Sequence, residues 1–373
     1  MGALKGITVL EMAGIGPGPF CAMLLADMGA RVIRIDRPDG PPGGRDDVVL
    51  RGRRSLALDL KNPAAVEAVR RMAAQSDALI EGFRPGVMER LGLGPDPLLE
   101  ANPRLIYGRM TGWGQDGPMA KLAGHDINYI ALTGALHAMG DADRPPPPPL
   151  NLVGDYGGGG MLLALGILAA LVERAGSGQG QVVDAAMVDG AALLMAPIYG
   201  MLARGRWKPE RGRNFLDGSA SFYGSYECGC GGHVAVGPIE PAFFAEMLTR
   251  MGLDAADFAD RMDPAHWPAH KARLAAAFRT RTRDEWAAVF ADSDGCVSPI
   301  LSMAEAPAHP HVAARETFVA AHGAVQPAPA PRMSRTPSSI GAAPPLRGEH
   351  GAEILAEFGF SAEEIKTLAP SRG

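Results

Sequence analysis

The segment that decides the fold is VLEMAGIGPGPFCAMLLADMGARVIRID, from Val9 to Asp36. An apolar run leads into a glycine-rich loop, an apolar helical stretch follows, and a second β-branched run ends in an acidic residue. This order predicts strand, turn, helix and strand, the first unit of a nucleotide-binding α/β fold. We expect strands over 6–12 and 31–36 and a helix over 18–29.

The same alternation continues along the chain. RSLALDL at 54–60, ALIEGF at 78–83 and RLIYGRMTGWG at 104–114 have the composition of strands, and an apolar-periodic helix is expected at 63–75. Strands that alternate with helices favour a parallel sheet. The fold class is therefore predicted to be α/β, with a Rossmann-like large domain.

Three local patterns punctuate the rest of the chain. The five prolines at 145–149 predict a polyproline II surface connector. The glycine cluster at 154–160 predicts a bend that opens a long apolar helix at 161–174. Strands at 223–227 and 233–236 flank a glycine-rich turn, which is typical of a hairpin.

After about residue 205 the sequence becomes polar and glycine-rich, which indicates a domain boundary. We expect three parts: a large domain at 1–204 completed by the C-terminal segment 325–373, a linker at 205–221, and a small α+β domain at 222–324.

The composition limits the partners. The chain has 373 residues, 47% of them hydrophobic, with 36 basic against 41 acidic residues and a net charge of −5. This balance favours neither a nucleic-acid partner nor a polybasic membrane contact. The longest apolar run, Met161 to Val172, is too short to span a bilayer, and no signal peptide is visible. We expect a cytoplasmic protein without a membrane partner.

The cysteines predict neither a metal site nor a disulfide framework. Cys228 and Cys230 form a C-x-C pair without a second pair of ligands nearby, while Cys21 and Cys296 stand alone. Reduced thiols and no bound metal are therefore expected.

The glycine-rich loop departs from the dinucleotide fingerprint. Gly14 and Gly16 supply the first two glycines of G-x-G-x-x-G, but Pro19 occupies the third position. Pro17 and Pro19 also lack the N–H groups that would bind phosphate. Arg37 directly follows the acidic Asp36, so an adenosine ligand with a phosphate near Arg37 remains open while NAD is disfavoured.

Two candidate acid/base residues lie in the middle of the chain. Histidine is the residue type best suited to proton transfer near neutral pH, and a carboxylate neighbour would orient the ring of His125. Asp155, at a helix start, is favoured as an anion by the helix dipole, whereas burial under a ligand would raise its pKa. Taken singly, His125 also fits a structural histidine, Asp155 an N-cap, and Glu240 a cap of the next helix.

Several motifs, in this order, resemble the family III CoA-transferase superfamily, and within it the α-methylacyl-CoA racemases. They are AGIGPGPF, ADMGARVIRIDRP, ERLGLGP, LIYGRMTGWGQDGP, AGHDINYIALTG, LNLVGDYGGGGM and GSGQGQVVDAAMVDG. The resemblance covers nearly the whole chain and is weakest after residue 335.

The resemblance implies racemisation of a 2-methylacyl-CoA thioester through an enolate, without a cofactor. His125 and Asp155 match the two bases, and Glu240 matches the carboxylate that partners the histidine. A backbone N–H beside Asp126 would stabilise the enolate. The CoA-binding residues implied are Arg37, Lys61, Arg84 and Arg90, with Gly124, Asp126, Asn128 and Tyr129 along the pantetheine and thioester.

The resemblance also implies an interlocked homodimer, in which Glu240 would come from the partner subunit. The principal alternative is a CoA-transferase, in which Asp155 would be the nucleophile that forms an acyl anhydride. A non-catalytic CoA-binding protein would lack the His125 and Asp155 pair, and a dehydrogenase would use NAD. The preferred 2-methylacyl group and the pathway are left open.

Overall fold

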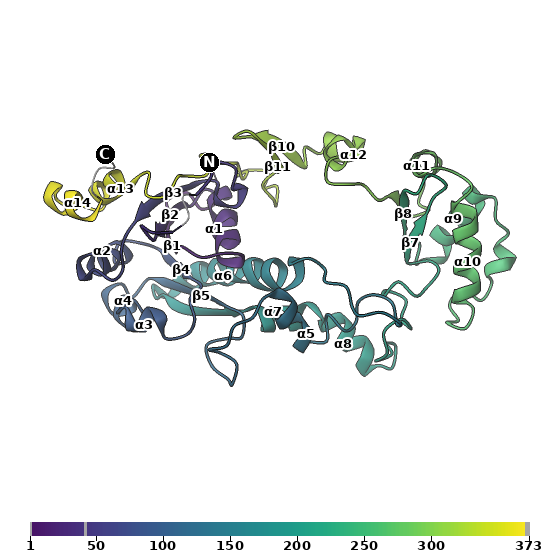
Figure 1. Ribbon diagram of the computed structural model, residues 1–373, viewed down its shortest axis with the longest axis horizontal. Helices are drawn as coiled ribbons and strands as arrows, with labels where there is room; N and C mark the ends of the chain where they lie inside the picture. The colour runs from purple at the N-terminus through teal and green to yellow at the C-terminus, as the bar shows by residue number, and fades with distance from the viewer. Residues whose placement is uncertain (1, 41–42, 370–373) are drawn as a thin grey trace. The chain divides into compact units, whose positions relative to one another are not determined.

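The computed structural model describes residues 2–40 and 43–369 (Figure 1). Six parallel strands form one sheet, in the order β3-β2-β1-β4-β5-β6. This order reverses between β1 and β4, and ligands of such sheets bind at the carboxyl ends of the strands at that point. The strands are β1 (Thr8–Met12), β2 (Arg31–Asp36), β3 (Arg53–Ala57), β4 (Ala78–Glu81), β5 (Ile106–Thr111) and β6 (Gln181–Ala186).

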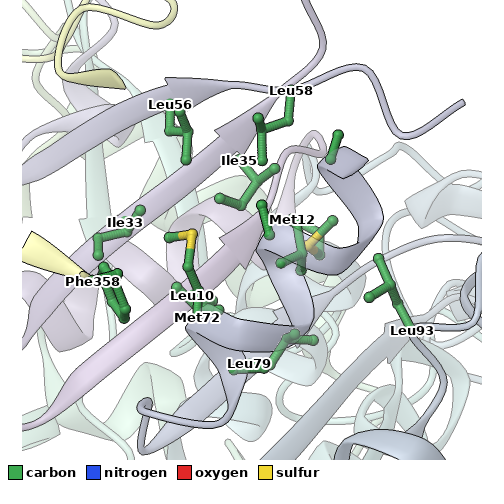
Figure 2. Packing of buried hydrophobic residues seen from close by; sticks show 14 of the residues in the cluster. Leu10, Met12, Ile33, Ile35, Leu56, Leu58, Met72, Leu79, Leu93 and Phe358 are labelled. Atoms are coloured by element: carbon green, nitrogen blue, oxygen red, sulfur yellow. The ribbon is translucent and has the colours of Figure 1, made fainter. Parts of the chain in front are cut away.

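Neighbouring residues of each strand supply two cores, one on each face of the sheet. Leu10, Ile33 and Leu79 pack against α2, α4 and α13, where Phe358 joins them (Figure 2). Val9 and Ile106 pack on the other face. The helices of the first face are α2 (Pro63–Ala73), α3 (Val87–Arg90), α4 (Pro95–Ala101) and α13 (Gly351–Glu357), and those of the second are α1 (Pro17–Asp27), α5 (Asp126–Leu132), α6 (Leu162–Ser177) and α7 (Met187–Leu194). The predicted α/β, Rossmann-like architecture is confirmed.

A smaller α+β unit has its own core. Strands β7 (Gly224–Glu227), β8 (His233–Val236) and β9 (Val297–Pro299) form an antiparallel sheet, so the predicted hairpin is confirmed and gains a third strand. Phe222, Phe278 and Trp286 are fully buried in this core. Its helices are α8 (Ala196–Ala203), α9 (Pro241–Met251), η3 (Ala255–Phe258), α10 (Trp267–Phe278), α11 (Arg283–Phe290) and η4 (Ala306–Ala308).

The remaining elements lie outside the two sheets described above. They are η1 (Val48–Leu50), α12 (Pro310–Ala314), the hairpin strands β10 (Phe318–Ala321) and β11 (Ala324–Pro327), and α14 (Ala362–Leu368).

The two compact units divide the chain at other residues than expected. The large unit ends at Leu194 rather than 204 and resumes at His311 rather than 325, and the small unit also takes in Gly134–Pro148. One guanidinium explains part of this difference. Arg211 donates to the carbonyl oxygens of His137, Asp141 and Arg144, so the expected linker at 205–221 holds this stretch of chain.

The glycine cluster is helical instead of forming a bend. Residues Leu152–Met161 form a π-helical segment, η2, which continues into α6. The continuous helix Leu152–Ser177 therefore has 26 residues and is long and apolar enough to span a bilayer. The expectation based on the shorter apolar run was wrong about this length. Leu163, Ile167 and Ala170 of this helix are buried in the core on the sheet.

A buried ionic network lies below the glycine-rich loop. Glu11 is fully buried and accepts from Arg34 at 2.6 Å and from Arg53 at 2.8 Å. Arg53 also donates to the carbonyl oxygen of Pro19 in α1. Removing one member of such a network leaves a buried charge without its partner, which costs about 3–5 kcal/mol.

Glu11→Gln is expected to lower the free energy of unfolding by about 3 kcal/mol, because Arg34 and Arg53 lose their shared anion. Urea unfolding of the full chain measures this loss. Glu246→Gln serves as the control, since its pair with Arg250 at 3.1 Å is partly exposed and contributes about 0.5 kcal/mol or less. Equal unfolding midpoints for the two variants would contradict the stabilising role of the network.

Candidate active site

A cavity of about 690 Å³ opens at the carboxyl ends of β1, β4 and β5, next to the point where the strand order reverses. Its lining is mainly apolar, but the two predicted acid/base side chains, from separate elements, both reach it. They are His125, at the start of α5, and Asp155, in η2. The structure thus brings together the two predicted acid/base residues.

Close backbone packing holds η2 in place. A Cβ on Gly190 of α7 would lie 1.8 Å from the carbonyl oxygen of Gly158, and a Cβ on Gly160 would lie 2.7 Å from that of Pro17 in α1. Neither position has room for a side chain. The predicted bend at the glycine cluster was therefore wrong, because the glycines serve close helix packing and place Asp155 in the first turn of a helix.

The surroundings of Asp155 raise its pKa. Burial is the main cause, and the negative charge of Asp126 adds to it. A hydrogen bond from Asn151 Nδ2 to Asp155 Oδ2, at 3.1 Å, and the nearby His125 act in the opposite direction. The carboxyl group is thereby suited to both accepting and returning a proton.

His125 is exposed to the cavity and caps α5. Its carbonyl oxygen accepts from the N–H of Asn128 at 2.8 Å, and its own N–H donates to Asn128 Oδ1 at 3.0 Å. Tyr129 of α5 packs edge-on against Trp113 and donates to the carbonyl oxygen of Gly124. A Cβ on Gly112 would overlap the Tyr129 ring, so this position admits only glycine.

The Asp126 side chain does not line the cavity, so its expected role beside the thioester is left to its backbone N–H. The residue is 5% exposed, and its Oδ2 accepts from the N–H groups of Gly154 at 2.6 Å and Asp155 at 2.7 Å. Its carboxylate thus contacts the beginning of η2.

A second cavity of about 450 Å³ adjoins the first. The two share Gly14, Ile15 and Phe83, and the second is also lined by Arg34, Arg37 and Arg347. Asp36 lies there too, but its carboxylate accepts from Arg34 at 3.0 Å and from Ser55 at 2.6 Å. It is already bound in the protein, which further weakens a role as the ribose acceptor of NAD.

Arg84 lines the first cavity from the loop after β4. A chain of charges holds the ends of this loop. Arg109 joins Glu81, at 3.0 Å, to Glu89 of α3, at 2.8 Å. Burial raises the pKa of Glu81 to about 7, against the opposing effects of Arg109 and the Phe83 N–H.

Four predicted site residues lie elsewhere. Lys61 and Arg90 are exposed and line neither cavity, and the Asn128 side chain bonds the backbone of His125. Glu240 lies in the small unit as the exposed N-cap residue of α9.

Sequence reasoning missed several lining residues, including Ile15, Trp113, Tyr156 and Asn151. Asn151 matters most, because it bonds Asp155 directly. Its spacing of four residues before Asp155 was the available signal, since such residues are neighbours on a helix. The glycines after Asp155 concealed that helix.

Comparisons with known proteins identify the family of this chain. The model of CoA-transferase family III matches residues 4–351. The α-methylacyl-CoA racemases of Mus musculus and Homo sapiens are 47% and 46% identical, over 99% and 98% of this chain and 97% and 96% of their own lengths. The crystal structure of a CAIB/BAIF family protein from Brucella suis superposes with a TM-score of 0.80 at 29% identity, covering 96% of this chain and 99% of that one. The chain belongs to CoA-transferase family III.

Proposed function

We propose that the protein is a racemase of 2-methylacyl-CoA thioesters. It removes the α-proton from one face of the α-carbon and returns a proton to the other face, without a cofactor. The observation that carries the proposal is that one cavity holds both His125 and Asp155, on separate elements. Identity of 46–47% to racemases over nearly the full chain supports the same reaction.

The reaction requires two groups that exchange a proton with one carbon. One group accepts the α-proton while the electron pair of the C–H bond passes into the thioester, giving an enolate. The other group returns a proton to the opposite face, so no atom is gained or lost. His125 and Asp155 exchange these two roles according to the starting epimer, and the raised pKa of Asp155 supports its use as a base.

The enolate oxygen requires a hydrogen-bond donor. Asp126 is the first residue of α5, so helix geometry leaves its N–H without an acceptor inside the helix. It lies next to His125 in the chain, which supports it as the donor.

The second cavity supports binding of the CoA nucleotide. Arg37 and Arg347 line it, and guanidinium groups bind phosphate through paired donors. Arg84, on the first cavity, extends the positive charge toward the pantetheine. Removal of the Arg37 side chain should raise KM for the CoA thioester more than for a truncated pantetheine thioester, which lacks the nucleotide; equal changes would argue against this contact.

A homodimer is part of the proposal. Met161, Leu165 and Val172, on the η2–α6 helix, are 57%, 63% and 76% exposed, which is a large apolar surface for a lone chain. In a dimer, Glu240 of one subunit would support His125 of the other.

Inactive His125→Ala and Glu240→Ala dimers should then recover part of their activity when refolded together, and no recovery would oppose a shared site.

The function is tested with a single (2R)-2-methylacyl-CoA epimer, no added cofactor, and chiral analysis of the product. The expected result is a mixture of epimers, and loss of at least about 10²-fold in kcat for His125→Ala and for Asp155→Ala. CoA exchange with an added free carboxylic acid is measured in parallel. Robust exchange without epimerisation would instead favour a transferase with Asp155 as nucleophile.

Asn151→Ala is expected to move the acid limb of kcat/KM to higher pH. The Asn151 amide stabilises the Asp155 carboxylate, so its removal raises the pKa of Asp155 and the base forms only at higher pH. The limb is measured for both epimers, because Asp155 is the base for one of them. An unchanged limb for both epimers would show that this carboxyl group does not control the reaction.

A further inference from the structure

The beginning of η2 has backbone donors that the helix itself cannot satisfy. Its first internal bond runs from the N–H of Tyr156 to the carbonyl oxygen of Asn151, at 3.3 Å. The preceding N–H groups therefore need acceptors from elsewhere. Those of Gly154 and Asp155 find one in Asp126 Oδ2, at 2.6 and 2.7 Å, from a residue 28 positions earlier in the chain.

Asp126 also belongs to the element that carries His125. It is the first residue of α5, and His125 is the N-cap residue whose carbonyl oxygen accepts from Asn128 and Tyr129. The Asp126 side chain thus links the two proposed bases: Asp126 follows His125 in the chain, and its carboxylate accepts from the backbone N–H of Asp155.

Resting on the proposed function, we propose that the Asp126 side chain is a positioning residue that sets the separation of His125 and Asp155 across the substrate α-carbon. Its carboxylate is buried and does not line the cavity, so a positioning role fits it better than a direct contact with the substrate. Loss of the carboxylate would leave two buried N–H groups without an acceptor and free the first turn of η2 to move.

The fit between Asp126 and η2 is tight. A Cβ on Gly154 would lie 2.6 Å from Asp126 Oδ2 and 3.3 Å from Ile130 Cγ2. Gly154→Ala therefore displaces the carboxylate without changing its charge. Gly154→Ala is thus a second way to separate the Asp126 carboxylate from the first turn of η2.

The charge of Asp126 has a separate effect. Its Oδ1 is buried and has no hydrogen-bond partner among the described residues. The groups that act on the Asp155 carboxyl include Asp126 and Tyr129 of α5, and the N-cap residues His125 of α5 and Asn151 of η2. Asp126→Asn keeps an acceptor for the N–H groups but removes the charge, so it separates position from electrostatics.

The test uses each epimer in D₂O and compares two rates by NMR: α-deuterium incorporation into the recovered epimer, and formation of the other epimer. When both bases are correctly spaced, the proton removed on one face is replaced on the other. When Asp155 is displaced, a base returns solvent deuterium to the face from which it took the proton. Exchange with retention then exceeds epimerisation.

We expect Asp126→Ala and Gly154→Ala to lower the epimerisation kcat by about 10²-fold, with KM within about two-fold, and to raise the ratio of exchange to epimerisation. Asp126→Asn should keep the wild-type ratio, lose less than about ten-fold in kcat, and show an acid limb at lower pH, because the Asp155 carboxylate loses a negative neighbour.

Asp217→Ala is the matched control. The Asp217 carboxylate also accepts backbone N–H groups, from Gly212 at 2.9 Å and Asn214 at 3.0 Å, but it lies in the small unit. Asp217→Ala should lower the thermal stability of the protein and leave the ratio of exchange to epimerisation unchanged.

A wild-type ratio in folded Asp126→Ala would overturn the inference, as would a proportional fall of both rates. If Asp126→Ala fails to fold, a wild-type ratio in Gly154→Ala overturns it instead. Absence of both exchange and epimerisation in the wild-type protein would be a different result, because it would refute the proposed function itself.

Discussion

The site depends on the close approach of η2 to the helices on either side of it. Helices can pack backbone to backbone only where side chains are absent, and the glycines at 157–160 and at 190 provide this. The approach brings Asp155 next to the glycine-rich loop, where a Cβ on Gly16 would lie 3.3 Å from its Oδ2. The glycine-rich loop and the carboxylate that we propose as a proton acceptor therefore line one cavity.

The electrostatics around this carboxylate differ from those of a phosphate-binding loop. Loops of that kind favour an anion by pointing N–H groups at it. Here Pro17 and Pro19 lack two such donors, and the N–H groups of Gly154 and Asp155 donate to Asp126. The Asp155 carboxylate accepts a hydrogen bond from Asn151, which opposes the effects of burial and of the negative Asp126 on its pKa. The balance leaves it ready to accept a proton.

The sequence predicts the parts that depend on local pattern. The β2 strand has the expected bounds, α2 begins at the expected proline, and both strands of the β7–β8 hairpin were anticipated. Patterns fail where distant contacts decide. The π-helical η2 forms because α1 and α7 accept its glycines, and the unit boundary follows the contacts of Arg211. Distant contacts also decide which residues reach the cavities: Lys61 and Arg90 matched a family motif but line neither cavity. The bond from Asn151 to Asp155 became visible only once η2 was known to be helical.

The pairing of the two bases is tested most directly by the α-deuterium content of each epimer early in the reaction of the wild-type protein in D₂O. Two bases on opposite faces predict that the newly formed epimer carries solvent deuterium while the recovered starting epimer keeps its proton. Deuterium that enters the recovered epimer before the other epimer forms would indicate a single base. Such a result would contradict the pairing of His125 with Asp155.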